Sequence, residues 1–126
     1  MNFANHQHKE AFLQFLCQMA RQDCYHRAVA YLMALDAEIR KHPRDVFDFN
    51  EDCILPETAL RHGWQTGTSQ KTTRLLMNLW NGWANDFDKN GDAFSSALYT
   101  VDEIFCCSYA PYYWEAIKLR YPEYCE

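Results

Sequence analysis

The chain has 126 residues, a length that suits one domain built around a single hydrophobic core. Apolar residues make up 48% of the sequence and charged residues 23%, which excludes a wholly disordered chain. The net charge of −5 argues against a protein whose whole surface binds nucleic acid or an anionic membrane.

The expected location of the protein follows from its apolar stretches and its cysteines. The longest uncharged stretches, such as residues 75–85, have about half of the roughly 20 residues that a membrane-spanning helix needs. Residues 1–10 are polar and lack the apolar core of a secretion signal. The six cysteines form no CxxC pair and are typical of free thiols in a reducing compartment. We therefore expect a cytoplasmic protein without membrane contact.

The choice of residues favours helices over strands. Leu and Ala together number 24, whereas the β-branched residues Val and Ile number only seven. Each of the four prolines lies where a helix could begin or end. We expect an all-α fold, in which residues 1–126 form a single helical domain of five to seven helices.

The N-terminal part of the sequence predicts two helices joined by a short turn. The first runs from about His6 to Arg21 and carries an apolar stripe that begins at Phe12. Asp23 is placed to cap a second helix that reaches about His42. Because the connection is so short, we expect the two helices to form an antiparallel hairpin.

The middle of the sequence predicts a connector followed by two helices. Residues 43–56 form an acidic, irregular connector, in which Phe47 and Phe49 are expected to anchor the chain to the core. Pro56 then starts a short helix that ends near residue 62. A long helix follows and runs to about Gly82 or Ala84.

The C-terminal part predicts a loop and two more helices. Residues 86–92 form a turn-rich loop, and Thr100 with Glu103 matches a capping box at the start of the next helix. Pro111 begins the last helix, which stops before Pro122. The N-terminal hairpin is expected to pack on this C-terminal, aromatic-rich helical layer.

The start of the long middle helix has the composition of an anion-binding site. Thr68 or Ser69 is placed to cap the helix, where free backbone N–H groups and the helix dipole can hold a phosphate or carboxylate. A Walker loop is excluded because Gln70 stands where a glycine would precede the lysine. The alternative is a well-capped helix with an exposed basic flank. The candidate anion-binding residues are Thr68, Ser69, Lys71, Arg74, Arg61 and Trp64, with His62 as a further source of charge.

A second motif matches the first half of a calcium-binding loop. Its oxygen-bearing residues are Asp86, Asp88, Asn90 and Asp92, arranged around a glycine. The twelfth position, which would carry a bidentate glutamate, is Ala97, so an ordinary turn is favoured and the four residues remain weak calcium candidates. No His and Cys spacing is typical of zinc. We expect no bound metal and no cofactor.

Aromatic and acidic segments are candidates for contact with a partner protein. Residues 101–124 contain seven aromatic rings, too many to face inward together, and exposed Tyr and Trp are favoured at interfaces. The alternative is an aromatic lid on the core with hydroxyl groups at its rim. Residues 45–57 and 86–103 each contain five acids, which either neutralise the basic middle of the chain or form separate patches. The candidate contact residues are Tyr109, Tyr112, Tyr113, Trp114, Tyr121, Asp48, Asp52 and Asp88.

Three stretches, residues 64–69, 73–82 and 101–124, carry a resemblance to a known family. The chain resembles a family of small uncharacterised proteins, a domain of unknown function found in Gram-positive gut bacteria and in their conjugative elements and phages. The resemblance covers most of the chain and is strongest from Gly63 onward. It implies a stand-alone domain carried as cargo on mobile DNA, and it transfers no activity and no catalytic residue.

Two functions from different classes follow. The first is a non-enzymatic, protein-binding accessory protein of a mobile element, which docks on a host or mobile-element protein. Such a protein could inhibit a bacterial defence system, because a small acidic protein can block a basic nucleic-acid channel. The alternative is a nucleotide or nucleic-acid phosphate binder at Thr68 and Ser69 with Lys71 and Arg74, although nucleic acid is not the favoured partner. An enzyme is not favoured, because no nucleophile and base occur at a recognisable spacing.

Overall fold

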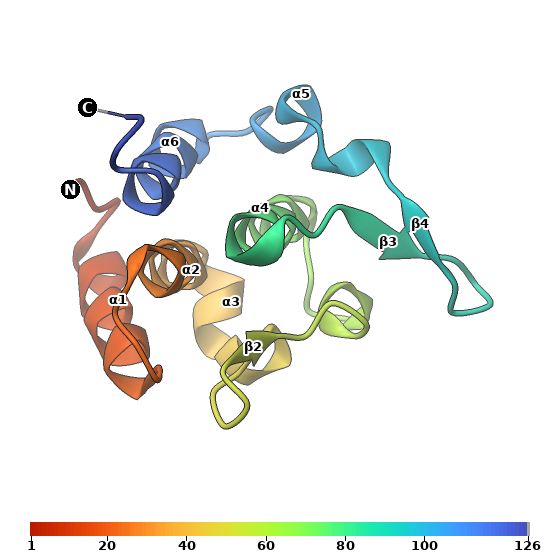
Figure 1. Ribbon diagram of the computed structural model, residues 1–126, viewed down its shortest axis with the longest axis horizontal. Helices are drawn as coiled ribbons and strands as arrows, with labels where there is room; N and C mark the ends of the chain where they lie inside the picture. Colours follow the sequence, from red (N-terminus) through yellow and green to blue (C-terminus); the bar gives the residue numbers. More distant parts are fainter. Residues whose placement is uncertain (126) are drawn as a thin grey trace.

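The structure is a computed structural model that describes residues 1–125 (Figure 1). Its α-helices are α1 (His6–Gln18), α2 (Cys24–Leu35), α3 (Ala37–Lys41), α4 (Gly67–Asn81), α5 (Val101–Ile104) and α6 (Ala110–Arg120). Single 3-10 turns lie at η1 (Pro43–Asp45), η2 (Ala59–Arg61) and η3 (Ala97–Tyr99). Two hairpins complete the fold: β1 (Phe47–Asp48) pairs with β2 (Cys53–Ile54), and β3 (Asn85–Phe87) pairs with β4 (Ala93–Ser95).

Helix α2 lies at the centre of the fold. It packs against α1, α4 and α6, which surround it in Figure 1. All of its residues from Ala28 to Leu35 are buried, as expected for a helix covered on every side. The predicted helical class is confirmed, as is the packing of the N-terminal hairpin on a C-terminal layer rich in aromatic residues. The described residues form one mostly helical domain with a single core.

The first two helices begin where short polar side chains cap them. Asn5 caps α1 and Asp23 caps α2, each by accepting a hydrogen bond from the backbone N–H three residues further on, at 2.8 and 3.1 Å. The predicted cap at Asp23 is thus confirmed. Helix α1 is shorter than predicted and ends at Gln18 rather than near Arg21, because Met19 adopts an extended backbone.

The second predicted helix is wrong in its length, because the chain breaks at Asp36. The Asp36 carboxylate accepts hydrogen bonds from the backbone N–H groups of Glu38 and Ile39 at 2.9 and 3.0 Å and so starts α3 as a new helix. Arg40 donates from Nη1 to the two carbonyl groups that precede the break, at 2.7 and 3.1 Å. These carbonyls would otherwise lack partners at the end of α2.

The connector over residues 43–56 is more regular than predicted, since it contains η1 and the β1–β2 hairpin. Phe47 lies opposite Ile54 in that hairpin and is fully buried. Phe49 is half-buried, and its ring centroid lies 5.2 Å from that of Phe47. Both rings therefore anchor the connector, as predicted. The helix expected from Pro56 is instead the single turn η2.

A projecting hairpin replaces the loop expected over residues 86–92. Strands β3 and β4 pair antiparallel with Asp86 opposite Phe94, and they extend away from the helices (Figure 1). The turn between them contains Gly91, whose φ of +82° lies in the left-handed region that glycine adopts without steric cost.

The last two helices differ in how well the sequence predicted them. The capping box at the start of α5 is wrong: Thr100 occupies the N-cap position, but its hydroxyl donates to the Ala97 carbonyl at 2.8 Å. Pro111 lies in the first turn of α6, close to where it was expected. Within residues 1–125, every helix falls short of the length or the apolar character needed to cross a membrane.

Candidate functional site

The predicted anion site at the start of α4 is built differently from the expectation. The N-cap is Thr66, not Thr68 or Ser69, and Thr66 and Ser69 form a reciprocal capping box at 2.7 and 3.2 Å. Ser69 is fully buried, and its hydroxyl donates to Gln65 Oε1 at 2.5 Å. The Ser69 hydroxyl, a candidate for holding phosphate, is therefore engaged within the protein.

The two cations nearest to this helix start are engaged within the protein. Lys71 donates from Nζ to the backbone carbonyl of Glu103 in α5. Arg74 forms an ion pair with Asp86 of β3, with 3.3 Å between Nη2 and Oδ2, and both side chains are largely buried. Lys71 and Arg74 thus hold α4 against α5 and the projecting hairpin.

Trp64 is packed among polar rings rather than standing free. Its ring stacks on His42 with centroids 4.8 Å apart and on His62 at 6.0 Å, and its Nε1 donates to Asp45 Oδ2 at 2.8 Å. This packing leaves less of the indole for stacking on a nucleobase. Arg61, at the end of η2, remains exposed.

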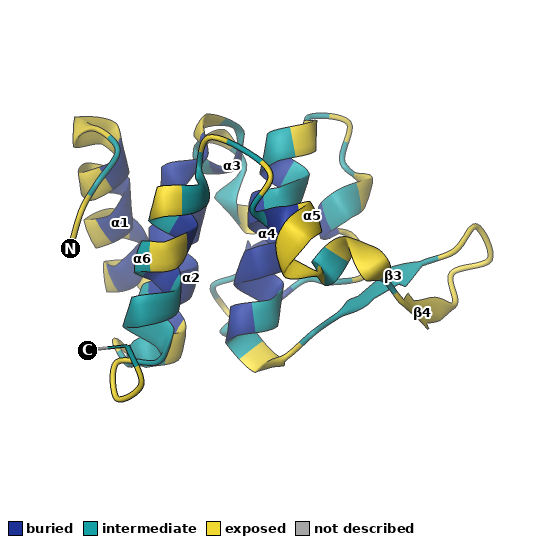
Figure 2. Ribbon diagram, turned by 90° about the horizontal axis from the view of Figure 1, so that it is seen from above, coloured by how far each residue is buried: buried dark blue, intermediate teal, exposed yellow. Residues whose placement is uncertain are grey.

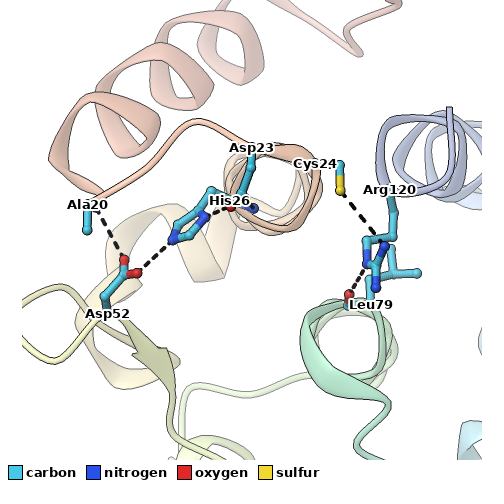
Figure 3. A network of polar contacts seen from close by, with 7 residues as sticks. All are labelled: Ala20, Asp23, Cys24, His26, Asp52, Leu79 and Arg120. Atoms are coloured by element: carbon cyan, nitrogen blue, oxygen red, sulfur yellow. Dashed lines mark hydrogen bonds and ion pairs between the residues drawn. The ribbon is translucent and has the colours of Figure 1, made fainter.

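A cluster that the sequence did not predict joins a buried imidazole to two carboxylates (Figure 3). His26 is 4% exposed; its Nδ1 lies 2.6 Å from Asp23 Oδ1 and its Nε2 lies 2.7 Å from Asp52 Oδ2. The imidazolium form satisfies both carboxylates, because it carries a proton on each nitrogen. Burial acts to raise the pKa of Asp23, but the hydrogen bonds and charge of His26 outweigh it and hold that pKa below its usual value.

The His26 cluster ties three segments of the chain together. Asp52 lies in the β1–β2 loop with a φ of 56°, a left-handed conformation that Asp tolerates better than most residues. Its second oxygen accepts a hydrogen bond from the Ala20 N–H at 3.3 Å, in the turn between α1 and α2. Both ring nitrogens of His26 are thus engaged by carboxylates. An open cavity of about 430 Å³ lies beside the cluster, with Tyr25 and Trp80 in its wall.

Arg120 of α6 makes a second link, also drawn in Figure 3. Its Nε donates to the Leu79 carbonyl at 2.7 Å, near the end of α4. The guanidinium carbon lies 3.7 Å from the ring centroid of Tyr25 and 4.5 Å from that of Tyr121. Tyr121, a candidate contact residue, is therefore held against Arg120.

The other candidate aromatic residues differ widely in exposure. Tyr113 is fully buried, and its hydroxyl lies 2.7 Å from Thr72 Oγ1. Burial raises the pKa of Tyr113. Tyr109 and Tyr112 are half-buried, whereas Trp114 is 50% exposed. A fully buried ring cannot contact a partner at the surface, so Tyr113 is removed from the candidate set.

All three candidate acidic residues make hydrogen bonds within the fold, and they differ in exposure. Asp48 accepts hydrogen bonds from the backbone N–H groups of Asn50 and Glu51 at 2.9 and 3.0 Å and closes the β1–β2 turn. Asp52 is engaged with His26. Asp88, at the tip of the projecting hairpin, is exposed.

The weak calcium candidates make separate contacts. Asp86 accepts from Arg74 and from the Ser96 hydroxyl at 2.7 Å, whereas Asp88 accepts from the backbone N–H groups of Asn90 and Asp92 and closes the turn. Within residues 1–125, no group of three or more His, Cys, Asp or Glu side chains is arranged to hold a metal ion.

The segment from β4 to α5 carries the exposed apolar residues that sequence reasoning missed. Phe94 is 48% exposed, Leu98 43% and Val101 73%. Figure 2 shows this segment as largely exposed. The Asn90-Gly91 pair, which lies between two aromatic residues, is typical of a hairpin turn and would have predicted the hairpin from the sequence.

Carboxylates accompany these apolar side chains. We call the combined set the hairpin surface; it consists of Phe94, Leu98, Val101, Asp88, Asp92, Asp102 and Glu103, all exposed. Within residues 1–125 its four carboxylates form no ion pair. Hydrogen bonding at the start of α5 lowers the pKa of Asp102, so this residue stays ionised.

These features define a small, mostly helical domain with one projecting β-hairpin. The chain belongs to DUF6075, a family of unknown function, whose sequence profile matches residues 1–126. This membership confirms the part of the resemblance that concerns an uncharacterised family. No curated protein and no solved structure matches the chain.

Proposed function

We propose that the chain is a non-enzymatic binding protein that docks the hairpin surface on a basic region of another protein. One observation carries the proposal: three large apolar side chains are exposed within the eight residues from Phe94 to Val101, and the four carboxylates of residues 88–103 in the same segment have no ion-pair partner in the described chain. Exposed apolar groups of this kind, rimmed by polar residues, mark interaction sites.

The two parts of the hairpin surface would serve different steps of binding. The carboxylates attract a positively charged partner over several ångströms and raise the rate of association. The apolar side chains then lose water in the contact and slow dissociation. Trp114 is the candidate from the predicted aromatic set that solvent reaches most, and it stays a candidate for a wider contact.

The cellular setting of the proposal rests on the sequence. The resemblance supports an accessory protein of a mobile element, with a host or mobile-element protein as partner. The net charge of −5 supports an inhibitor of a bacterial defence system that acts on a basic channel. The cytoplasmic location is supported by the six cysteines, which are all free in the described chain.

The test is capture of a partner with matched variants. Immobilised wild-type protein, a Phe94→Ser/Val101→Ser variant and a Leu13→Ser variant are exposed to a lysate of the organism that carries the gene. Leu13 is 52% exposed on α1 and controls for loss of an exposed apolar side chain elsewhere. We expect the wild type and Leu13→Ser to retain the same basic protein and to release it at raised salt, and the double variant to retain far less. Equal capture by all three proteins would contradict the proposal.

The phosphate-binding alternative stays a prediction that needs its own measurement. Exposed Arg61 supports it, whereas the engagement of Lys71 and Arg74 within the fold does not. Thermal-shift assays at low salt with nucleotides and short oligonucleotides test it. A ligand-induced shift that Arg61→Ala removes would support a phosphate site, and the absence of any shift would exclude it.

A further inference from the structure

The projecting hairpin has a fixed hydrogen-bond register. The Asp88 N–H donates to the Asp92 carbonyl at 2.9 Å, and the Ser96 N–H donates to the Ala84 carbonyl at 3.1 Å. In an antiparallel pair of strands, every second pair of opposite residues exchanges backbone hydrogen bonds. Asp86 and Phe94 lie opposite each other, midway between the two hydrogen bonds just named, and therefore form such a pair. The backbone groups of Ala93 and Ser95 therefore point away from β3.

The two edges of this hairpin differ in exposure, because β3 is half-buried and β4 is exposed, and in the engagement of one carbonyl group. On the β3 edge, the Asn85 carbonyl accepts hydrogen bonds from Trp83 Nε1 at 2.7 Å and from the Tyr99 hydroxyl at 3.2 Å. On the β4 edge, no described residue supplies a hydrogen-bond partner to the backbone of Ala93 or Ser95, and every residue of the strand is exposed. An exposed row of free N–H and C=O groups is a template for another strand.

We propose that the β4 edge accepts an extended, basic segment of another polypeptide as a third strand of this sheet. The inference rests on the proposed function and specifies how the partner binds. In strand addition, main-chain hydrogen bonds supply affinity and alternate side chains supply specificity. The outward groups of Ala93 and Ser95 supply two donors and two acceptors for such a strand.

The charge around the edge selects the kind of segment. Asp88 and Asp92 lie at the hairpin tip and Asp102 and Glu103 follow β4, while Lys89 is the single base between residues 86 and 103. A strand with alternating basic residues meets this surface favourably. A second copy of the chain would bring a net charge of −5 against the same charge, so charge complementarity favours a basic partner over self-pairing.

The register supplies a matched pair of variants. Ser95→Pro removes one outward N–H and leaves the hairpin's own hydrogen bonds at Phe94 and Ser96 in place, since proline is accepted at strand edges whose N–H faces solvent. Ser95→Ala alters the side chain and keeps that N–H. Amide NMR signals of Asp88 and Ser96 verify that the hairpin persists in each variant.

The probe is a synthetic peptide of alternating Lys and Val, compared with a Glu and Val peptide and with a Lys and Val peptide N-methylated at every residue. We expect the Lys and Val peptide to bind the wild type and Ser95→Ala equally and to shift the Ala93 and Ser95 amide signals. We expect about tenfold weaker binding to Ser95→Pro, because one backbone hydrogen bond is lost. The Glu and Val peptide and the N-methylated peptide should bind weakly or not at all.

Other outcomes overturn the inference, and they separate it from the proposed function. If Ser95→Pro and the N-methylated peptide bind as well as their controls, strand addition is wrong, while docking on the hairpin surface stands. If no Lys and Val peptide binds, strand addition is again wrong, and the capture experiment alone decides the proposed function. If the wild type self-associates and Ser95→Pro does not, the occupant is a second copy and not a basic partner.

Discussion

The core-facing side of the α1–α2 pair and the hairpin surface differ in how their side chains are partnered. In the α1–α2 pair, even a buried polar ring is fully partnered: His8 accepts a hydrogen bond from the Ala4 N–H at 3.0 Å and donates to the Tyr31 carbonyl at 2.9 Å. In the hairpin surface, large apolar groups such as Phe94 face solvent. The first region therefore supplies stability and the second is available for recognition, so variants in the two should change different measurements.

The largest expected effect is a core truncation in α2. Leu32 is fully buried in the helix at the centre of the fold. We expect Leu32→Ala to lower the free energy of unfolding by about 4 kcal/mol, through lost burial and the cavity left behind. Urea unfolding followed by circular dichroism measures it. Leu13→Ala, on the exposed face of α1, is the control and should cost well under 1 kcal/mol; equal losses would show that α2 is not the centre of the core.

The next effect is a loss of stability in acid that originates at His8. Burial, chiefly, lowers the pKa of His8 from 6.5 to about 4 in the folded protein. Between those two pH values the unfolded chain binds a proton that the folded chain does not. Stability therefore falls as pH falls from 6.5 to 4, by about 3 kcal/mol from this residue.

Urea unfolding at several pH values measures the His8 contribution. We expect His8→Gln to reduce the steepness of the stability loss over this range. His6→Gln, which changes an exposed histidine on the same helix, should leave the steepness unchanged. A His8 ring that titrates near pH 6.5 by NMR would contradict the argument.

A smaller effect is expected at the break between α2 and α3. Asp36 is 4% exposed, and burial raises its pKa although the N–H groups of Ile39 and Glu38 oppose that rise. Asp36→Ala removes the cap and should cost about 1.5 kcal/mol in urea unfolding. Asp36→Asn keeps an acceptor without burying a charge and should stay within about 0.5 kcal/mol of wild type. A loss as large for Asp36→Asn as for Asp36→Ala would show that the charge, not the hydrogen bonds, is needed.

The sequence predicted those parts of the fold that depend on local patterns. Asp23 before an apolar stripe and Pro111 at a helix start act through residues within one turn, so their positions were predicted well. The cap at Asp36 was not predicted, because the residues around it all suit a continuous helix. In the structure Asp36 is buried, and its carboxylate accepts the hydrogen bond from the Ile39 N–H that starts α3. The hydrogen bonds at the break are themselves local, so the sequence contained their partners but not the sign that the helix would stop there.

The candidate sites were predicted less well, for a different physical reason. Lys71 and Arg74 have the composition of an anion site, but their partners Glu103 and Asp86 lie far along the chain. Composition alone does not show which charges the fold itself engages. The contact between His26 and Asp52 likewise joins residues 26 positions apart and has no local signal.

The smallest stability effect is expected where the effect on binding is largest. Phe94 is about half exposed, so Phe94→Ser should change the free energy of unfolding by no more than about 0.5 kcal/mol in urea. The same substitution should sharply weaken partner capture, because the side chain would lose its buried area in the complex. Trp114→Ser, in the other exposed aromatic region, tests whether the contact extends to α6. If Phe94→Ser instead unfolds the hairpin, seen as loss of the Asp88 and Ser96 amide signals, then Phe94 serves the fold and the division between the two regions is wrong.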